Sequence, residues 1–344
     1  MKNNSSYKRN KRNSRRALLL LMLLVTGSML GTSTYAWFTS NKTVSVSDIT
    51  VNVASKNGIQ ISVDGTNWKS ILSTTDLVAA KTTYPAALNQ IPSESSSIQP
   101  VSTVGTILDG GLMQMFVGDV PSNNEGNYIL TSEETKEVNG TAGDFIAFDV
   151  FLKSDKAVDV DMTGSSGVKA NGTDTGIKNA SRIAFIVEGS TTSDDTVENI
   201  QGLELTAGST EGVYFWEPNY NVHSGTGIAN ARDTYGLVIT EDEENPLSYD
   251  GIKTTISADD NILLGEATAA KYADKFNTVS IDYKTKDSFA AEDVISVFSL
   301  PAGITKVRVY MWIEGQDVDC ENNASGGNIN YSLQFTIHEE TEEV

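Results

Sequence analysis

The sequence predicts an all-β protein, a β-sandwich of the jelly-roll or Greek-key kind with long loop insertions and little helix. Apolar residues alternate with polar ones through many short segments, and turn-forming residues separate these segments. Helical periodicity is almost absent, and many short strands with intervening turns are typical of sandwiches. The chain has 344 residues, which is long enough for a large core.

The first strand is expected at residues 44–53. Its alternating apolar residues are Val44, Val46, Ile49, Val51 and Val53, and a phase slip at Ser47 and Asp48 predicts a bulge. A second apolar run leads into Asp64-Gly65, a dipeptide typical of a tight hairpin turn. Residues 84–127 hold four of the seven prolines and a serine-rich patch, so we expect a long loop excursion there.

Regular strands are expected again at 144–152, 158–162 and 183–187. The first of these carries apolar residues on both faces, which predicts a central strand. Residues 190–280 are acidic and mixed, which indicates an insertion or elaborated loops, with a short helix near 266–274. The clearest alternation lies in the last pair of strands, at 307–314 and 329–337.

The first 36 residues have the form of a secretory signal peptide. A stretch with seven Lys and Arg and no acidic residue precedes an apolar run at 17–30, which is shorter than a membrane-spanning helix. We expect cleavage between Ala36 and Trp37, which leaves one domain at 37–344 in a secreted or surface-associated protein. The alternative is that the leader stays uncleaved and anchors the chain in a membrane. If the leader is cleaved, the chain meets a membrane only through the leader before cleavage.

Charge and cysteine content restrict the partners of the chain. Loss of the seven leader charges lowers the net charge from −20 to −27, which disfavours nucleic acid as a partner. Cys320 is the only cysteine, so no disulfide can form within the chain. Its thiol is expected either to be buried as a small apolar group or to link two chains.

Three segments resemble a known family. They are the leader end at 31–39 (GTSTYAWFT), residues 180–185 and the segment 309–320. Together they resemble the TasA/camelysin-type exported proteins of Gram-positive bacteria. The resemblance implies a dedicated signal peptidase, a secreted jelly roll, and assembly into extracellular fibres or biofilm matrix with copies of itself or sister subunits. In such assembly, the N-terminal strand of one subunit completes the sheet of the next.

The strand at 44–53 is the expected donor, because cleavage after Ala36 frees its N-terminal side. Its apolar face would dock along an open sheet edge through the residues Val44, Val46, Ile49, Val51 and Val53. The alternative is an ordinary first strand that pairs within its own chain. Alternation indicates a half-buried strand but not which sheet it joins.

Enzymatic chemistry is not expected. A zinc-peptidase motif needs two histidines one helical turn apart, whereas the only two histidines are His223 and His338. Hydrolase and phosphate-loop motifs are also missing from the sequence. No cofactor is therefore expected, with a calcium ion as the one exception.

Two segments remain as candidate sites. Oxygen ligands for Ca²⁺ gather between the last two strands, at Glu314, Asp317, Asp319 and Glu321; the alternative is a solvated acidic turn. The second segment is an aromatic and polar loop with Trp216, Asn219, Tyr220 and His223. Exposed, it would suit a glycan-binding adhesin acting as a monomer. The alternative is that its aromatic residues close one end of the core.

Overall fold

The computed structural model describes residues 43–53, 58–91, 97–119, 131–138, 140, 142–229, 279–285 and 293–338. The predicted cleavage site at Ala36 and Trp37 and the predicted helix at 266–274 lie outside these ranges. All described residues belong to a compact unit that spans residues 36–344. Among them, no helix has the length and apolar character needed to cross a membrane.

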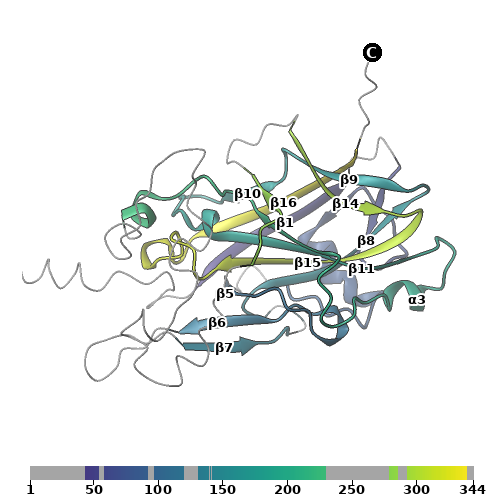
Figure 1. Ribbon diagram of the computed structural model, residues 1–344, viewed down its shortest axis with the longest axis horizontal. Helices are drawn as coiled ribbons and strands as arrows, with labels where there is room; N and C mark the ends of the chain where they lie inside the picture. Colours follow the sequence, from purple (N-terminus) through teal and green to yellow (C-terminus); the bar gives the residue numbers. More distant parts are fainter. Residues whose placement is uncertain are drawn as a thin grey trace, which may run out of the picture. The chain divides into compact units, whose positions relative to one another are not determined.

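The described residues form two β-sheets, which confirms the prediction of an all-β sandwich. The first sheet contains β14 (Val294–Leu300), β9 (Val158–Thr163), β16 (Asn328–Ile337), β1 (Val44–Val53) and β3 (Ile71–Ser73) in that order, with β10 (Gly167–Ala170) beside β16 and β4 (Ser97–Ile98) beside β1. Figure 1 shows its long strands β1 and β16 side by side.

The second sheet is larger. Its order is β13 (Tyr283–Lys284), β12 (Val213–Glu217), β11 (Ser181–Thr191), β15 (Gly303–Glu314), β5 (Pro100–Ser102), β6 (Met115–Asp119) and β7 (Thr131–Thr135), with β8 (Ile146–Ser154) beside β15 and β2 (Gln60–Ser62) beside β8. The helices with given bounds are short: α2 (Thr74–Ala79), α3 (Val197–Gln201), and the 3₁₀ turns η2 (Ala80–Thr82), η3 (Asp109–Gly111), η4 (Ile177–Ala180) and η7 (Asn322–Ala324). Residues 225–229 are also helical.

Strand β15 lies at the centre of the second sheet and is buried on both faces. Val309 and Met311 face the main core between the two sheets, which both sheets line. Tyr310 and Trp312 face a second core on the other side, beneath residues of the 101–115 segment. Successive side chains of β15 therefore alternate between the two faces of the sheet, as the sequence predicts. Both faces are covered by a core, so neither row of side chains faces solvent. Strand β8 is likewise buried almost throughout, which confirms that it is central.

Strand β1 is paired within its own chain. It runs parallel to β16 from Ser45 opposite Asn328 to Val53 opposite Phe335. The register shifts between Val46 and Asp48, so the predicted bulge is confirmed. On its other side β1 has only short antiparallel contacts with β3 and β4. All five predicted apolar residues of β1 are buried, as expected for a strand that covers the core.

The turn after β2 is longer than the predicted tight hairpin. Strand β2 pairs with β8, and Ile61 meets Lys69 only as an isolated bridge. The buried carboxylate of Asp64 organises the turn by accepting hydrogen bonds from the backbone amides of Thr66 (2.9 Å) and Asn67 (2.8 Å). Burial opposes ionisation, but these bonds and one from the Thr83 hydroxyl outweigh it and lower the pKa of Asp64.

The two predicted loop regions also contain strands. In 84–127, the short strands β4, β5 and β6 join the sheets. In 190–280, the described part holds α3 and β12, and β12 is an interior strand of the second sheet. Both segments therefore belong to the sandwich where they are described.

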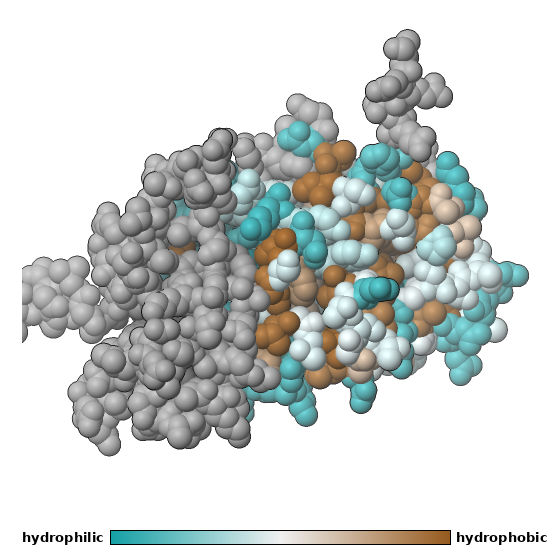
Figure 2. Space-filling view, viewed as in Figure 1, coloured by the Kyte–Doolittle hydropathy of each residue, from teal (hydrophilic) through white to brown (hydrophobic). Residues whose placement is uncertain are grey.

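The surface carries small apolar groups among polar ones. On the face seen in Figure 2, hydrophobic residues reach the surface in several small groups bordered by hydrophilic residues. The large apolar side chains with the highest exposure come from different elements: Ile71, Val78, Leu88, Val138, Val197 and Val294. Scattered exposure of this kind is normal for a protein surface.

Candidate functional site

The two candidate segments of the sequence meet in one cluster of buried charges. This acidic cluster comprises Arg182 on β11, Glu217 at the end of β12, His223, and four carboxylates from the end of β15 and the loop after it, Glu314, Asp317, Asp319 and Glu321. Strand β11 lies between β12 and β15, so the sheet order brings these segments together.

Arg182 is the fixed positive charge of the acidic cluster and is fully buried. Its Nη2 lies 2.5 Å from Oδ2 of Asp317 and 2.8 Å from Oε1 of Glu217. Its Nη1 donates to the carbonyl oxygens of Asn179 (3.1 Å) and Ser181 (2.9 Å). Burial alone would lower the pKa of Arg182, but the two carboxylates outweigh it and raise that pKa.

His223 and Asp319 form the second contact of the cluster. The imidazole Nδ1 lies 2.9 Å from Oδ2 of Asp319, and the Ser224 amide donates to Oδ1 of the same carboxylate at 2.7 Å. The Asp319 amide in turn donates to Oδ1 of Asp317 at 2.9 Å. One ligand atom from each of His223, Asp317 and Asp319 lies within 4.8 Å of the other two.

Among the residues that the structure describes, the acidic cluster holds more negative than positive groups. Five of these described residues are carboxylates, against one guanidinium and one imidazole, and all five carboxylates are buried. Burial raises the pKa of Asp317 to about 7, in spite of Arg182 beside it, and it also raises the pKa of Glu314. Such an arrangement favours either protons or a further cation within the cluster.

The alternative of a solvated acidic turn is wrong, because Glu314, Asp317, Asp319 and Glu321 are all buried. Only Asp317 and Asp319 approach His223 as a compact group. Glu314 instead accepts from the Trp312 indole (3.2 Å) and the Gln316 amide (3.1 Å). Binding of Ca²⁺ by the four carboxylates stays a prediction.

Trp216 and Asn219 are buried, whereas a glycan-binding surface at this loop would need them exposed. Trp216 lies on β12, is fully buried, and donates its indole hydrogen bond to the Thr285 hydroxyl at 3.2 Å. Asn219 is also buried, and its amide group donates to the carbonyl oxygens of Val168 and Lys178. Tyr220 is half-buried beside them. A sugar cannot stack on a ring that the core already covers, so the core-closing alternative holds for Trp216.

Cys320 lies in the same loop and is buried as a free thiol. Burial and the neighbouring carboxylates raise its pKa well above the ordinary value. Its thiol therefore behaves as a small apolar group, and a link between two chains through Cys320 would require the loop to open.

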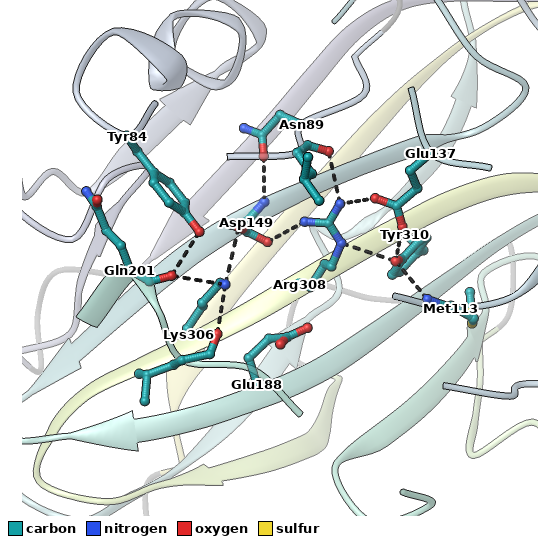
Figure 3. Close-up of polar contacts among 12 residues, drawn as sticks. Tyr84, Asn89, Met113, Glu137, Asp149, Glu188, Gln201, Lys306, Arg308 and Tyr310 are labelled. Atoms are coloured by element: carbon teal, nitrogen blue, oxygen red, sulfur yellow. Dashed lines mark hydrogen bonds and ion pairs between the residues drawn. The ribbon is translucent and has the colours of Figure 1, made fainter. Parts of the chain in front are cut away.

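A second buried polar network lies where residues 84–89 and 201–203 meet strands β8 and β15 (Figure 3). Arg308 is its centre: its Nη1 lies 2.6 Å from Oδ1 of Asp149, and its Nη2 bonds both Glu137 and the Leu88 carbonyl oxygen. Lys306 donates to the carbonyl oxygens of Gln201 (3.3 Å) and Leu203 (2.8 Å). These bonds fasten the surrounding loops to the sheet.

Glu188 is a buried acid of this network. One of its oxygens accepts from the Leu205 amide at 2.9 Å, and burial raises its pKa to about 7. Among the described residues, Asp149 pairs with both Lys306 and Arg308, and Glu137 pairs with Arg308. Sequence reasoning missed this network, because its residues come from segments far apart in the chain.

Comparison of the chain with protein-family models, curated proteins and solved structures finds no match.

Proposed function

We propose that this chain is an exported, non-enzymatic structural protein of the bacterial surface or extracellular matrix, related to the TasA-type proteins. In this proposal it associates with copies of itself by exchange of strand β1 once the leader has been removed. The leader sequence supports export, and the position of β1 supports the mode of association.

The observation that carries the proposal is the pairing of β1 with β16. The two strands stand at opposite ends of the described chain, and they run parallel, so no hairpin ties one to the other. Withdrawal of β1 leaves the pairings of β16 with β9 and β10 in place, and besides the pairing with β16 itself it breaks only the short antiparallel pairings of β1 with β3 and β4 among the described strands. Withdrawal of β1 also exposes the edge of β16 to which it was paired. Strand β1 of a second copy can pair with this edge in the same register. Exchange of an identical element is a low-cost route to assembly.

The burial of β1 determines how fast this exchange can be. Val44, Ile49 and Val51 are each 1 % exposed or less, and burying a side chain of this size contributes roughly 1.5–3 kcal/mol. Opening one copy loses these contacts, and binding a second copy restores them. We therefore expect slow, concentration-dependent assembly from a stable monomer.

A non-enzymatic role agrees with the positions of the two histidines. His223 pairs with Asp319 in the acidic cluster. His338, which directly follows β16, pairs with Asp161 on β9. The two imidazoles therefore belong to different sites, each with its own carboxylate partner. This arrangement differs from the paired histidines of a zinc peptidase.

A disulfide lock tests the proposal. Thr50 of β1 is the register partner of Ser332 of β16, and both lie on the less buried face of the strands. Neighbouring strands lie about 4.8 Å apart, which suits a disulfide. The double variant Thr50→Cys/Ser332→Cys, in a chain of residues 37–344, should stay monomeric when oxidised and assemble when reduced.

Size-exclusion chromatography with light scattering and negative-stain microscopy measure the outcome. The unaltered chain, under both redox conditions, is the control for effects of the reductant. Equal assembly of the oxidised and reduced double variant would contradict exchange of β1. A monomer in every sample across a wide concentration range would contradict self-association itself.

A further inference from the structure

We propose that His223, Asp317 and Asp319 bind one divalent metal ion of the kind that takes nitrogen and oxygen ligands, such as Zn²⁺. This site differs from the predicted calcium site, because it includes an imidazole and leaves out Glu314 and Glu321. It is also independent of the proposed assembly through β1.

The spacing of the three side chains suits a single ion. Their ligand atoms lie within 4.8 Å of one another. Zinc binds nitrogen and oxygen at about 2.0–2.2 Å, so tetrahedral ligand atoms lie roughly 3.4 Å apart. Side-chain adjustments of about an ångström would bring the three groups into that geometry, and water would complete the coordination.

Existing hydrogen bonds hold both carboxylates in place. Arg182 and the Asp319 amide each donate to one oxygen of Asp317, and the Ser224 amide donates to Asp319. A carboxylate offers about four lone-pair positions, so each one keeps acceptor capacity for a metal. Donors of this kind orient the ligands in metal sites and are part of their design.

His223 provides an observation separate from the acidic residues. Its side chain is only 6 % exposed, and its Nε2 has no hydrogen-bond partner among the described residues. A buried imidazole with one nitrogen on a carboxylate and the other unpartnered is costly without a ligand. Coordination through Nε2 would supply that partner, whereas coordination through Nδ1 would replace its contact with Asp319. In either case the ion adds positive charge where the described carboxylates outnumber the described cations.

The backbone near Asp319 is shaped for close approach. A Cβ atom at Gly227 would lie 2.7 Å from Oδ1 of Asp319, and one at Gly176 would lie 3.7 Å from the same oxygen. Glycine at position 227 therefore lets the chain close over the carboxylate. This close packing helps to hold Asp319 beside His223.

The ligand set favours a transition metal over calcium. Calcium takes six to eight oxygen ligands, whereas imidazole nitrogen suits zinc, copper, iron and nickel. Two carboxylates and one imidazole form a mixed set of three protein ligands, as in open zinc sites.

The two histidines of the chain allow a sharp test. A chain of residues 37–344 without an affinity tag is stripped with EDTA and titrated with ZnCl₂, while imidazole resonances are followed by NMR. We expect saturable binding of one Zn²⁺ per chain, with a shift of the His223 resonances and little change at His338. A shift at His338 alone, or no saturable binding at millimolar Zn²⁺, would overturn the proposal.

Matched variants provide the second measurement. His223→Ala should weaken Zn²⁺ binding by more than about tenfold in calorimetry, whereas His338→Ala should leave it unchanged. Equal affinities of the two variants would contradict the site, and so would tighter binding of CaCl₂ than of ZnCl₂. If His223→Ala fails to fold by circular dichroism, the NMR titration of the unaltered chain decides the question.

Discussion

Replacement of Arg182 by methionine tests the account of the acidic cluster. Arg182→Met keeps most of the apolar volume of the side chain but removes the charge that faces Asp317 and Glu217. Both carboxylates are 1 % exposed or less, so water cannot replace the guanidinium. The substitution also leaves the carbonyl oxygens of Asn179 and Ser181 without this donor.

The expected cost follows from this burial. Removing one partner of a buried ion pair costs about 3–5 kcal/mol, because the remaining charge stays buried without compensation. The free energy of unfolding should fall by this amount, which lowers the ratio of folded to unfolded protein roughly 10²- to 10⁴-fold. A second substitution, Asp317→Asn, removes one of the stranded charges and should restore about 0.5–3 kcal/mol.

Urea unfolding followed by circular dichroism measures these free energies. The control is Lys69→Met, which removes an ion pair with Asp76 at 2.5 Å in which the Lys69 side chain is 48 % exposed. An exposed pair contributes about 1 kcal/mol or less. If Arg182→Met costs no more than Lys69→Met, the buried cluster does not hold the charges that we describe.

Three further predictions concern other parts of the fold. The unaltered protein should lose about 3 kcal/mol of stability between pH 4.5 and 7, because folded Glu188 keeps its proton up to a pKa of about 7 while the unfolded chain releases it near 4.5. Glu188→Gln should remove this loss. The same pH dependence of urea unfolding in both proteins would refute the prediction. Gly303→Ala should lower the free energy of unfolding by about 2–4 kcal/mol, since φ is +124° and a Cβ would lie 2.1 Å from the Thr191 carbonyl oxygen. The control Gly167→Ala, whose Cβ meets nothing within 4 Å, should show little change in thermal unfolding. Equal effects of the two substitutions would contradict the prediction. Trp216→Ala should cost about 3–5 kcal/mol in the same assay, because the ring is fully buried, and a change below 1 kcal/mol would indicate an exposed ring.

Much of the sandwich could be predicted from the alternation of residues. The strands at 307–314 and 329–337, and the bulge after Val46, are present as the pattern indicates. The pattern could not show that β15 has a second core on its outer face. Arg308, Tyr310 and Trp312 have the mixed polarity of a solvent-facing row, and only the segments that cover them reveal that they are buried.

The acidic cluster could be predicted from the sequence only in part. The carboxylates between β15 and β16 stand out in the sequence, but their partners do not. Arg182 lies 135 residues from Asp317, and His223 lies 96 residues from Asp319. Local spacing carries no signal for such contacts, because strand order and not chain proximity brings the groups together.

The most direct test of strand exchange uses two singly substituted chains. Chains of residues 37–344 with Thr50→Cys and with Ser332→Cys are mixed, incubated at high concentration and then oxidised. Exchange places the β1 cysteine of one chain beside the β16 cysteine of the other, so we predict a disulfide-linked heterodimer on non-reducing gels. As a control, Ser296→Cys on β14, which β9 separates from β16, replaces Ser332→Cys and should give little product. No heterodimer, or equal yields from both mixtures, would contradict the exchange of β1.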